Sequence, residues 1–168
     1  MNYDLIQIKQ LKRDDAVKFQ TLRLEALQND PDAFGSTFEE ENERPLTWFE
    51  EWIEKSAVFG AFHDGQLLGV AGLYAQQGLK RAHIGALRTM YVQPFARKAA
   101  IGKKLVMAII EFSNPLFELI HLGVGSKNVA AIRLYKSCGF VEYAVKKQAF
   151  KQNGQYIDEV MMAKNVRT

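Results

Sequence analysis

Residues 92–112, VQPFARKAAIGKKLVMAIIEF, combine a strand end, a turn and the start of an amphipathic helix. A helix N-terminus leaves several backbone N–H groups unpaired and carries a partial positive charge, so it attracts anions. Lys98, Lys103 and Lys104 add positive charge at the same place. The stretch is typical of a phosphate-binding turn, except that Ala100 stands where a glycine is expected.

A second helix is predicted over residues 128–138, NVAAIRLYKSC, with Gly139 as its left-handed C-cap. Asn128 suits the N-cap position, and Tyr135 is by default an amphipathic core residue that keeps a polar hydroxyl. Cys138, the one cysteine, lies at the helix C-terminus, where the helix dipole raises the pKa of a thiol. We therefore interpret Cys138 as a structural thiol and not as a nucleophile paired with a histidine.

The elements that must position these residues follow from hydrophobic periodicity and turn signals. Aspartate–glycine and asparagine–glycine pairs mark two hairpin turns, at residues 63–66 and 151–155. Strands are predicted over residues 3–11, 56–62, 67–75, 82–92, 119–124, 141–150 and 156–163, and helices from residue 14 and over 45–55, 99–113 and 128–138. This order predicts an α+β fold with a sheet of mixed direction.

The composition sets broad limits on the class of protein. A chain of 168 residues with 48% hydrophobic and 24% charged residues predicts one globular domain over residues 1–168. No apolar run is long enough to span a bilayer, and the N-terminus does not resemble a secretory signal. A single cysteine agrees with a reducing compartment, so we expect a cytoplasmic protein.

The two signs of charge are segregated along the chain. Residues 25–54 carry ten carboxylates against one cation, Arg44, whereas residues 80–151 carry thirteen Lys and Arg against three glutamates. Two solvated faces would explain this pattern. The alternative is a basic half for an anionic cofactor and an acidic half for a cationic substrate.

Together the two motifs resemble the GNAT superfamily of acyl-CoA-dependent N-acetyltransferases. The family's Arg/Gln-x-x-Gly-x-Gly/Ala turn is matched by residues 97–102, and its Asn-x-x-Ala-x-x-Leu-Tyr helix, with a following Gly-Phe, is matched by residues 128–140. The element order also matches over the whole chain. The resemblance implies a mixed, mostly antiparallel sheet of about seven strands flanked by helices and splayed between strands 4 and 5.

The resemblance further implies that acetyl-CoA is the co-substrate and that no metal is needed. The backbone from Arg97 to Lys103 would wrap the pyrophosphate, and backbone groups of Met90 and Val92 would contact the pantetheine arm and the thioester carbonyl. Tyr135 would donate a proton to the departing thiolate. The implied cofactor contacts are Met90, Tyr91, Val92, Arg97, Lys98, Ala99, Ala100, Ile101, Gly102, Lys103, Asn128, Ala131 and Tyr135.

The alanine at position 100 departs from the family pattern. If the turn requires a helical φ there, alanine costs only the room of one methyl group and gains helix propensity of up to about 1 kcal/mol over glycine. We expect the turn to hold a phosphate still, somewhat more loosely.

The general base is not identified by the sequence. Family members with a glutamate on the fourth strand carry it at the position of Ala86, which supplies no carboxylate. The remaining candidates are Glu39, Glu40, His83 and His121, or a water molecule.

The resulting hypothesis is an N-acetyltransferase that moves an acetyl group to a primary amine by direct attack in a ternary complex. The acidic segment favours a cationic acceptor such as a polyamine, an aminoglycoside, a lysine side chain or a peptide N-terminus. The alternative is a non-catalytic, CoA-sensing or partner-binding protein of the same fold. Nucleic acid is not an expected partner, because the basic half lacks interleaved aromatics. No membrane partner is expected either, because the apolar runs are short. A homodimer is one of the oligomeric states left open.

Overall fold

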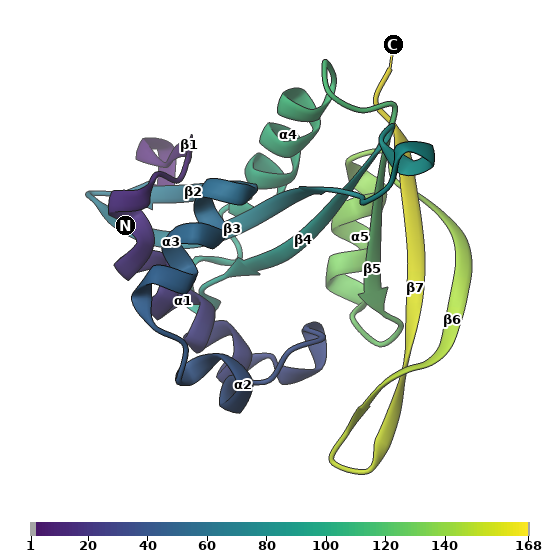
Figure 1. Cartoon of the computed structure of the whole chain (residues 1–168), viewed down its shortest axis with the longest axis horizontal. Coiled ribbons are helices and arrows are strands. Elements are labelled where there is room, and N and C mark those ends of the chain that lie inside the picture. The colour runs from purple at the N-terminus through teal and green to yellow at the C-terminus, as the bar shows by residue number, and fades with distance from the viewer. Residues whose placement is uncertain (1–2, 168) are drawn as a thin grey trace.

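The computed structural model describes residues 3–167 as a seven-stranded sheet with helices on both faces (Figure 1). The strand order is β1-β2-β3-β4-β5-β7-β6, and only the β4–β5 pair is parallel among these described strands. The strands are β1 (Gln7–Gln10), β2 (Ala57–His63), β3 (Gln66–Ala75), β4 (Ile84–Val92), β5 (Leu119–Gly125), β6 (Val141–Gln152) and β7 (Gln155–Asn165). The helices are α1 (Ala16–Asn29), α2 (Phe38–Asn42), α3 (Leu46–Lys55), α4 (Ile101–Ser113) and α5 (Val129–Ser137). The predicted α+β fold with a mixed sheet is thus confirmed.

Two details at the N-terminal end differ from the sequence-based prediction. The first strand is shorter than predicted, because residues 3–5 form a 3-10 turn. The short helix α2 was not predicted, since five residues are too few to show an apolar stripe. Its start is nevertheless a capping box, in which Glu40 N–H donates to Thr37 Oγ1 (3.2 Å) and Thr37 N–H donates to the Glu40 carboxylate (2.7 Å).

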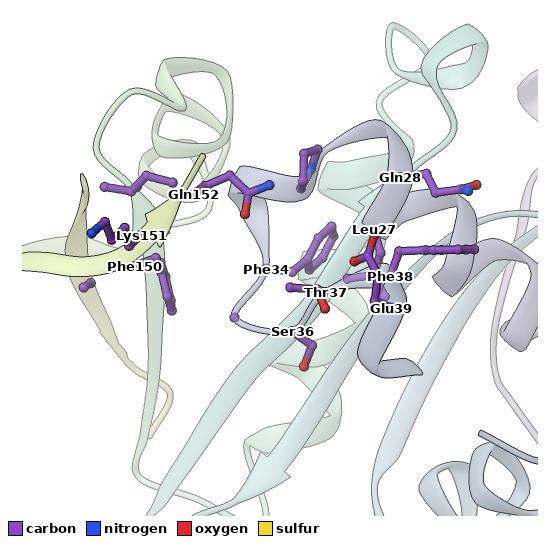
Figure 2. Close-up of a pocket in the computed structure, with 14 residues that line it drawn as sticks. Leu27, Gln28, Phe34, Ser36, Thr37, Phe38, Glu39, Phe150, Lys151 and Gln152 are labelled. Atoms are coloured by element: carbon purple, nitrogen blue, oxygen red, sulfur yellow. The ribbon is translucent and has the colours of Figure 1, made fainter. Parts of the chain in front are cut away.

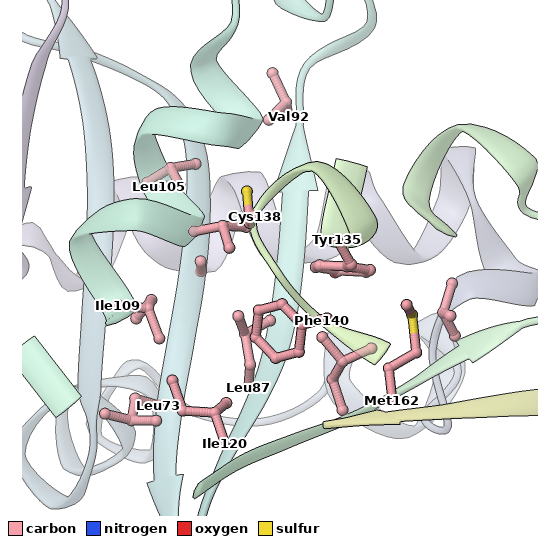
Figure 3. Packing of buried hydrophobic residues seen from close by; sticks show 14 of the residues in the cluster. Leu73, Leu87, Val92, Leu105, Ile109, Ile120, Tyr135, Cys138, Phe140 and Met162 are labelled. Atoms are coloured by element: carbon pink, nitrogen blue, oxygen red, sulfur yellow. The ribbon is translucent and has the colours of Figure 1, made fainter. Parts of the chain in front are cut away.

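Separate hydrophobic clusters cover the two faces of the sheet. On one face, α4 buries Leu105 and Ile109 against the sheet residues Leu73, Leu87 and Ile120 (Figure 3). On the other face, α1 and α3 form an aromatic cluster against β2 and β3, and its members are Phe19, Phe49, Trp48 and Trp52. The sheet is therefore a buried platform with both faces covered.

The sheet opens between β4 and β5, as predicted. These strands pair only from Ile84–Leu119 to Ala86–His121, although both continue well beyond that point. The register between β3 and β4 also shifts at a bulge, where Thr89 takes a φ of 60°. A left-handed conformation is unusual for a β-branched residue, and bulges often lie beside active sites, where they bend a strand and redirect side chains.

Candidate active site

The parted strands leave a cavity of about 930 Å³. One part of its wall is formed by β4, β5 and α5, and it includes Met90, Asn128, Ala131 and Tyr135. The rest of the wall is aromatic and charged. Its residues come from the α1–α3 side and β3, namely Arg23, Phe34, Glu41, Trp48, Trp52 and Tyr74, and from β6, namely Tyr143 and Phe150. The splay therefore brings Met90 of β4 and residues of the second predicted motif to a space that also opens toward α2 and the β6–β7 hairpin. The first motif, residues 97–102, does not line this cavity.

A smaller cavity of about 550 Å³ adjoins this space at the α1–α2 connection. Figure 2 shows Phe34 and Thr37 on one side of it and Phe150 and Lys151 of β6 on the other. Phe34 and Phe150 line both cavities. The smaller cavity therefore extends the larger one away from α5.

The turn before α4 has the features of an anion site. The N–H groups of Ile101, Gly102 and Lys103 begin the helix and find no backbone acceptor within residues 3–167. A Cβ on Gly102 would lie 3.1 Å from both Met90 Cε and Leu134 Cδ2, so the turn packs closely beside a cavity residue. The side chains of Lys98, Lys103 and Lys104 are exposed around it. The geometry suits the pyrophosphate of the expected co-substrate.

Ala100 is the N-cap of α4 and has φ 56° and ψ 15°, which is left-handed and not helical. The helical case considered from the sequence is therefore wrong, and helix propensity does not apply. An L-residue in this region costs about 1–2 kcal/mol, whereas glycine enters it freely. This conformation explains why a glycine is expected at this point of the turn.

Replacing Ala100 by glycine is accordingly expected to stabilise the fold by about 1 kcal/mol and to tighten acetyl-CoA binding by less than about tenfold. The methyl group is exposed, so its removal costs little packing. Thermal unfolding and a ligand-binding titration measure the two effects. Ala99→Gly is the matched control, because Ala99 is half-buried against the core and has no positive φ, so its loss should destabilise the protein. Equal shifts for both variants would contradict the assignment of strain to Ala100.

The side chain of Arg97 is engaged within the protein. Its Nε donates to the Val92 carbonyl (3.0 Å), its Nη2 forms an ion pair with Asp30, and its guanidinium lies 5.6 Å from the Tyr91 ring centre. Tyr91 in turn bonds to Glu25 and Asn29 through its hydroxyl. Arg97 thus links the turn to the C-terminal end of α1. Contact between its guanidinium and a phosphate stays a prediction.

Tyr135 is 5% exposed, and its ring packs on Phe140 at a centroid distance of 5.8 Å (Figure 3). It lines the cavity, and its hydroxyl has no hydrogen-bond partner within residues 3–167. Burial raises the pKa of Tyr135, so the phenol stays protonated at physiological pH. Asn128 caps α5 by accepting from Ala131 N–H (3.2 Å). The helix therefore presents an uncommitted proton donor to the cleft.

The four candidate bases are placed differently by the fold. Glu39 lines only the smaller cavity, and His83 is exposed and lines neither. Glu40 lines the larger cavity but holds its carboxylate on the N-terminal end of α2. His121 also lines it, directly opposite Ala86 on the paired part of the strands, and burial lowers the pKa of its imidazole.

Sequence reasoning missed a chain of hydrogen bonds at the β4 bulge. Trp52 Nε1 donates to Tyr74 Oη (2.6 Å), which lies 2.9 Å from Thr89 Oγ1. The indole N–H is only a donor, so Tyr74 Oη accepts from it, whereas either hydroxyl can donate in the Tyr74–Thr89 pair. The chain ends at Thr89, which lines the cavity. Desolvation raises the pKa of Tyr74, so its phenol stays protonated within this chain.

The acidic segment is largely occupied by structural contacts, which the sequence did not reveal. Arg23 and Glu41 form a buried bidentate ion pair with distances of 2.9 and 2.8 Å. Further ion pairs join Arg13 to Glu50 and Glu54, Lys55 to Glu51, and Arg97 to Asp30. By contrast, no carboxylate within residues 3–167 forms an ion pair with the cavity cations Arg44, Arg88 and Lys146. Glu159 of β7, also missed, lines the same cavity.

Three further observations concern the thiol, membrane spans and metal sites. Cys138 is buried at the end of α5, as expected of a structural thiol. Across residues 3–167, no helix is long and apolar enough to cross a membrane, and no three His, Cys, Asp or Glu side chains are grouped to hold a metal ion.

Comparisons with known proteins agree with the fold and the motifs. The profile of the acetyltransferase (GNAT) family matches residues 23–140. Phosphinothricin N-acetyltransferase of Alcaligenes faecalis is 30% identical over 104 residues, which cover 61% of this chain and 53% of that protein. Across three curated relatives, the matched segment spans 34% to 58% of the relative's own length.

Solved structures share the fold over nearly the whole chain. A GNAT-family acetyltransferase from Streptococcus pneumoniae has a TM-score of 0.85 at 21% identity, covering 95% of this chain and 99% of that one. A phosphinothricin acetyltransferase from Sinorhizobium meliloti, solved with acetyl-CoA, has a TM-score of 0.83 at 19% identity, covering 97% and 89%. Since the family profile covers well over half of the chain, and the turn before α4 and helix α5 carry the two motifs, this protein belongs to the acetyltransferase (GNAT) family.

Proposed function

We propose that residues 1–168 form a single N-acetyltransferase domain that moves an acetyl group from acetyl-CoA to a primary amine by direct attack in a ternary complex. The observation that carries this proposal is the cavity between β4 and β5, which has Met90 and Tyr135 at one end and a charged aromatic chamber at the other. One substrate can enter from each end, so the two can meet without a covalent enzyme intermediate.

Groups of this chain can bind the co-substrate, orient its thioester and protonate the leaving thiolate. Acetyl-CoA supplies the activated acetyl thioester. The free N–H groups at the start of α4 hold its pyrophosphate, and the backbone of Met90 lies beside the cleft to orient the thioester. Tyr135 gives its proton to the sulfur as the carbon–sulfur bond breaks.

We call the aromatic and charged part of the cavity, together with Arg44, Arg88 and Lys146, the acceptor chamber. Its charges support an acceptor amine that also carries an anionic group. Glu41 is neutralised by Arg23, and Glu40 is bound to the N-terminal end of α2, so the acidic segment offers little attraction for a polycation. Arg44, Arg88 and Lys146 line the cavity without an ion-pair partner in the described chain. Aromatic side chains between them favour an acceptor with an apolar part. This proposal replaces the cationic acceptor expected from the sequence.

A thiol-release assay with acetyl-CoA and a panel of amines tests the proposal. We expect turnover with anion-bearing amines such as phosphinothricin and free amino acids, and little with spermidine, an aminoglycoside or a neutral peptide N-terminus. Acetyl-CoA should also raise the melting temperature by mass action. A melting shift without turnover on any amine would favour the non-catalytic alternative, and the fastest turnover with spermidine would overturn the anionic acceptor.

A further inference from the structure

Glu159 reaches the cleft in an unusual way. Its strand, β7, pairs with β5 so that Glu159 is opposite Gly125 and Met161 is opposite Gly123. The side chain nevertheless leans across the neighbouring glycine: a Cβ on Gly123 would overlap Glu159 Oε1 and lie only 2.5 Å from its Cδ. Gly123 has no positive φ, so its backbone does not require glycine. The missing side chain at position 123 makes room for the carboxylate.

The Glu159 carboxylate lies close to the point where β4 and β5 begin to separate. The last pair between β4 and β5 joins Ala86 to His121, and Gly123 follows two residues later on the same face of β5. Glu159 therefore lies where the strands have already parted, within the cavity that Met90 and Tyr135 also line. Ala86, by contrast, offers no acidic group on β4.

The carboxylate is also uncommitted. No ion pair or hydrogen bond engages it within residues 3–167, although Lys146 is its cross-strand neighbour on β6. Glu41 and Glu40 are both engaged, and His121 lies at the closed end of the cleft. The other titratable or charged groups around the cavity are Arg23, Glu40, Glu41, Arg44, Tyr74, Arg88, His121, Tyr135, Tyr143 and Lys146.

We propose that Glu159, extended over Gly123 from β7, is the catalytic base that binds the acceptor ammonium and takes its proton before attack. The assignment rests on the proposed acetyl transfer. The ammonium nitrogen loses one proton to Glu159, attacks the thioester carbon, and loses a second proton as the intermediate collapses. The sulfur leaves as a thiol with the phenol proton of Tyr135. The second proton lost by the nitrogen then reprotonates Tyr135. Glu159 returns the first proton to solvent.

The first test is Glu159→Gln, which keeps the shape of the side chain and removes its charge. With the best amine of the panel, kcat/KM at pH 7 should fall by about 10²-fold, while acetyl-CoA affinity should be unchanged. The deficit should shrink as the pH rises toward the pKa of the amine, because more of the amine is then already neutral. A purely structural role would not give this pH dependence.

The second test moves the carboxylate to the other strand. In a Glu159→Ala background, Gly123→Asp should regain at least tenfold of the lost activity. A Cβ at position 123 falls at the place that the Glu159 carboxylate occupies in the wild type, so the aspartate carboxyl group would lie close to it. Gly123→Asn in the same background is the matched control of equal size, and it should regain none.

Three outcomes would overturn the assignment. These are turnover of Glu159→Gln within threefold of the wild-type value, equal recovery with aspartate and asparagine substitutions at position 123, and loss of activity in His121→Gln with Glu159→Gln unaffected. Each of them leaves the proposed function standing, since the wild-type chain is active in all three. A wild-type chain that binds acetyl-CoA but releases no thiol with any amine would instead overturn the proposed function, and this base with it.

Discussion

Tyr135→Phe is expected to lower turnover by about 10²–10⁴-fold while leaving acetyl-CoA affinity within about twofold of the wild-type value. The phenylalanine ring keeps the contact with Phe140, so the packing of α5 on the core is retained. What the substitution removes is the hydroxyl, which has no other partner in the described structure. A thiol-release assay and a ligand titration on the same preparation separate the two effects.

The protonation state of Tyr135 makes the prediction sharper. Because burial raises its pKa, the phenol remains a donor throughout the neutral and mildly alkaline range. The wild-type rate should therefore show no alkaline decline from this group up to about pH 10, the ordinary pKa of tyrosine.

Tyr143→Phe is the matched control, since Tyr143 lines the same cavity but is 53% exposed. It should leave turnover within about twofold. If Tyr135→Phe retained full turnover with the best acceptor, Tyr135 would be a packing residue and another group would protonate the thiolate.

The fold could be predicted from the sequence because its signals are local, and signals of the same kind supplied the residues proposed for one half of the candidate site. Alternation and hairpin turns mark the strands, and the spacing from Asn128 to Tyr135 places the cap and the phenol on one helix. The turn before α4 was found in the same way. The positive φ of Ala100 could not be predicted, because the sequence shows that a glycine is missing but not which conformation the turn requires.

The acceptor side could not be predicted because its charges are set by distant partners. Glu41 is neutralised by Arg23, 18 residues away, and Asp30 by Arg97, 67 residues away. The position of Glu159 depends on the strand pairing of β7 with β5 and on the absence of a side chain at Gly123. Only the capping box at Thr37 was a local signal that the sequence reading overlooked.

Arg23→Met is expected to destabilise the protein by about 3–5 kcal/mol, which for a chain of this size lowers the melting temperature by about 6–20 °C. Both side chains of the Arg23–Glu41 pair are nearly inaccessible, at 6% and 5% exposed. The guanidinium also lies 4.8 Å from the Phe34 ring centre and 5.1 Å from that of Trp52. Removing it leaves a buried carboxylate without a partner, and thermal unfolding measures the cost.

Arg13→Met is the control for the loss of an arginine. Arg13 lies in the 3-10 turn just before α1, the helix that carries Arg23. Arg13 also pairs with two glutamates, but it is exposed, so water takes the place of the lost contacts. Its melting temperature should stay close to that of the wild type. Equal destabilisation by the two substitutions would mean that burial of the Arg23 pair does not matter.

The double variant Arg23→Met and Glu41→Leu tests whether the ion pair contributes only to stability or also to binding of the acceptor. Replacing a buried pair by apolar side chains of similar volume is often neutral, so most of the lost stability should return. The net charge of the chamber is unchanged, because one cation and one carboxylate are removed together, and Arg44, Arg88 and Lys146 remain. The KM for an anion-bearing amine should therefore stay within about threefold of the wild-type value. A large rise in KM in this stable double variant would show that Arg23 contacts the acceptor itself, and that its pairing with Glu41 in the empty cleft gives way when the acceptor binds.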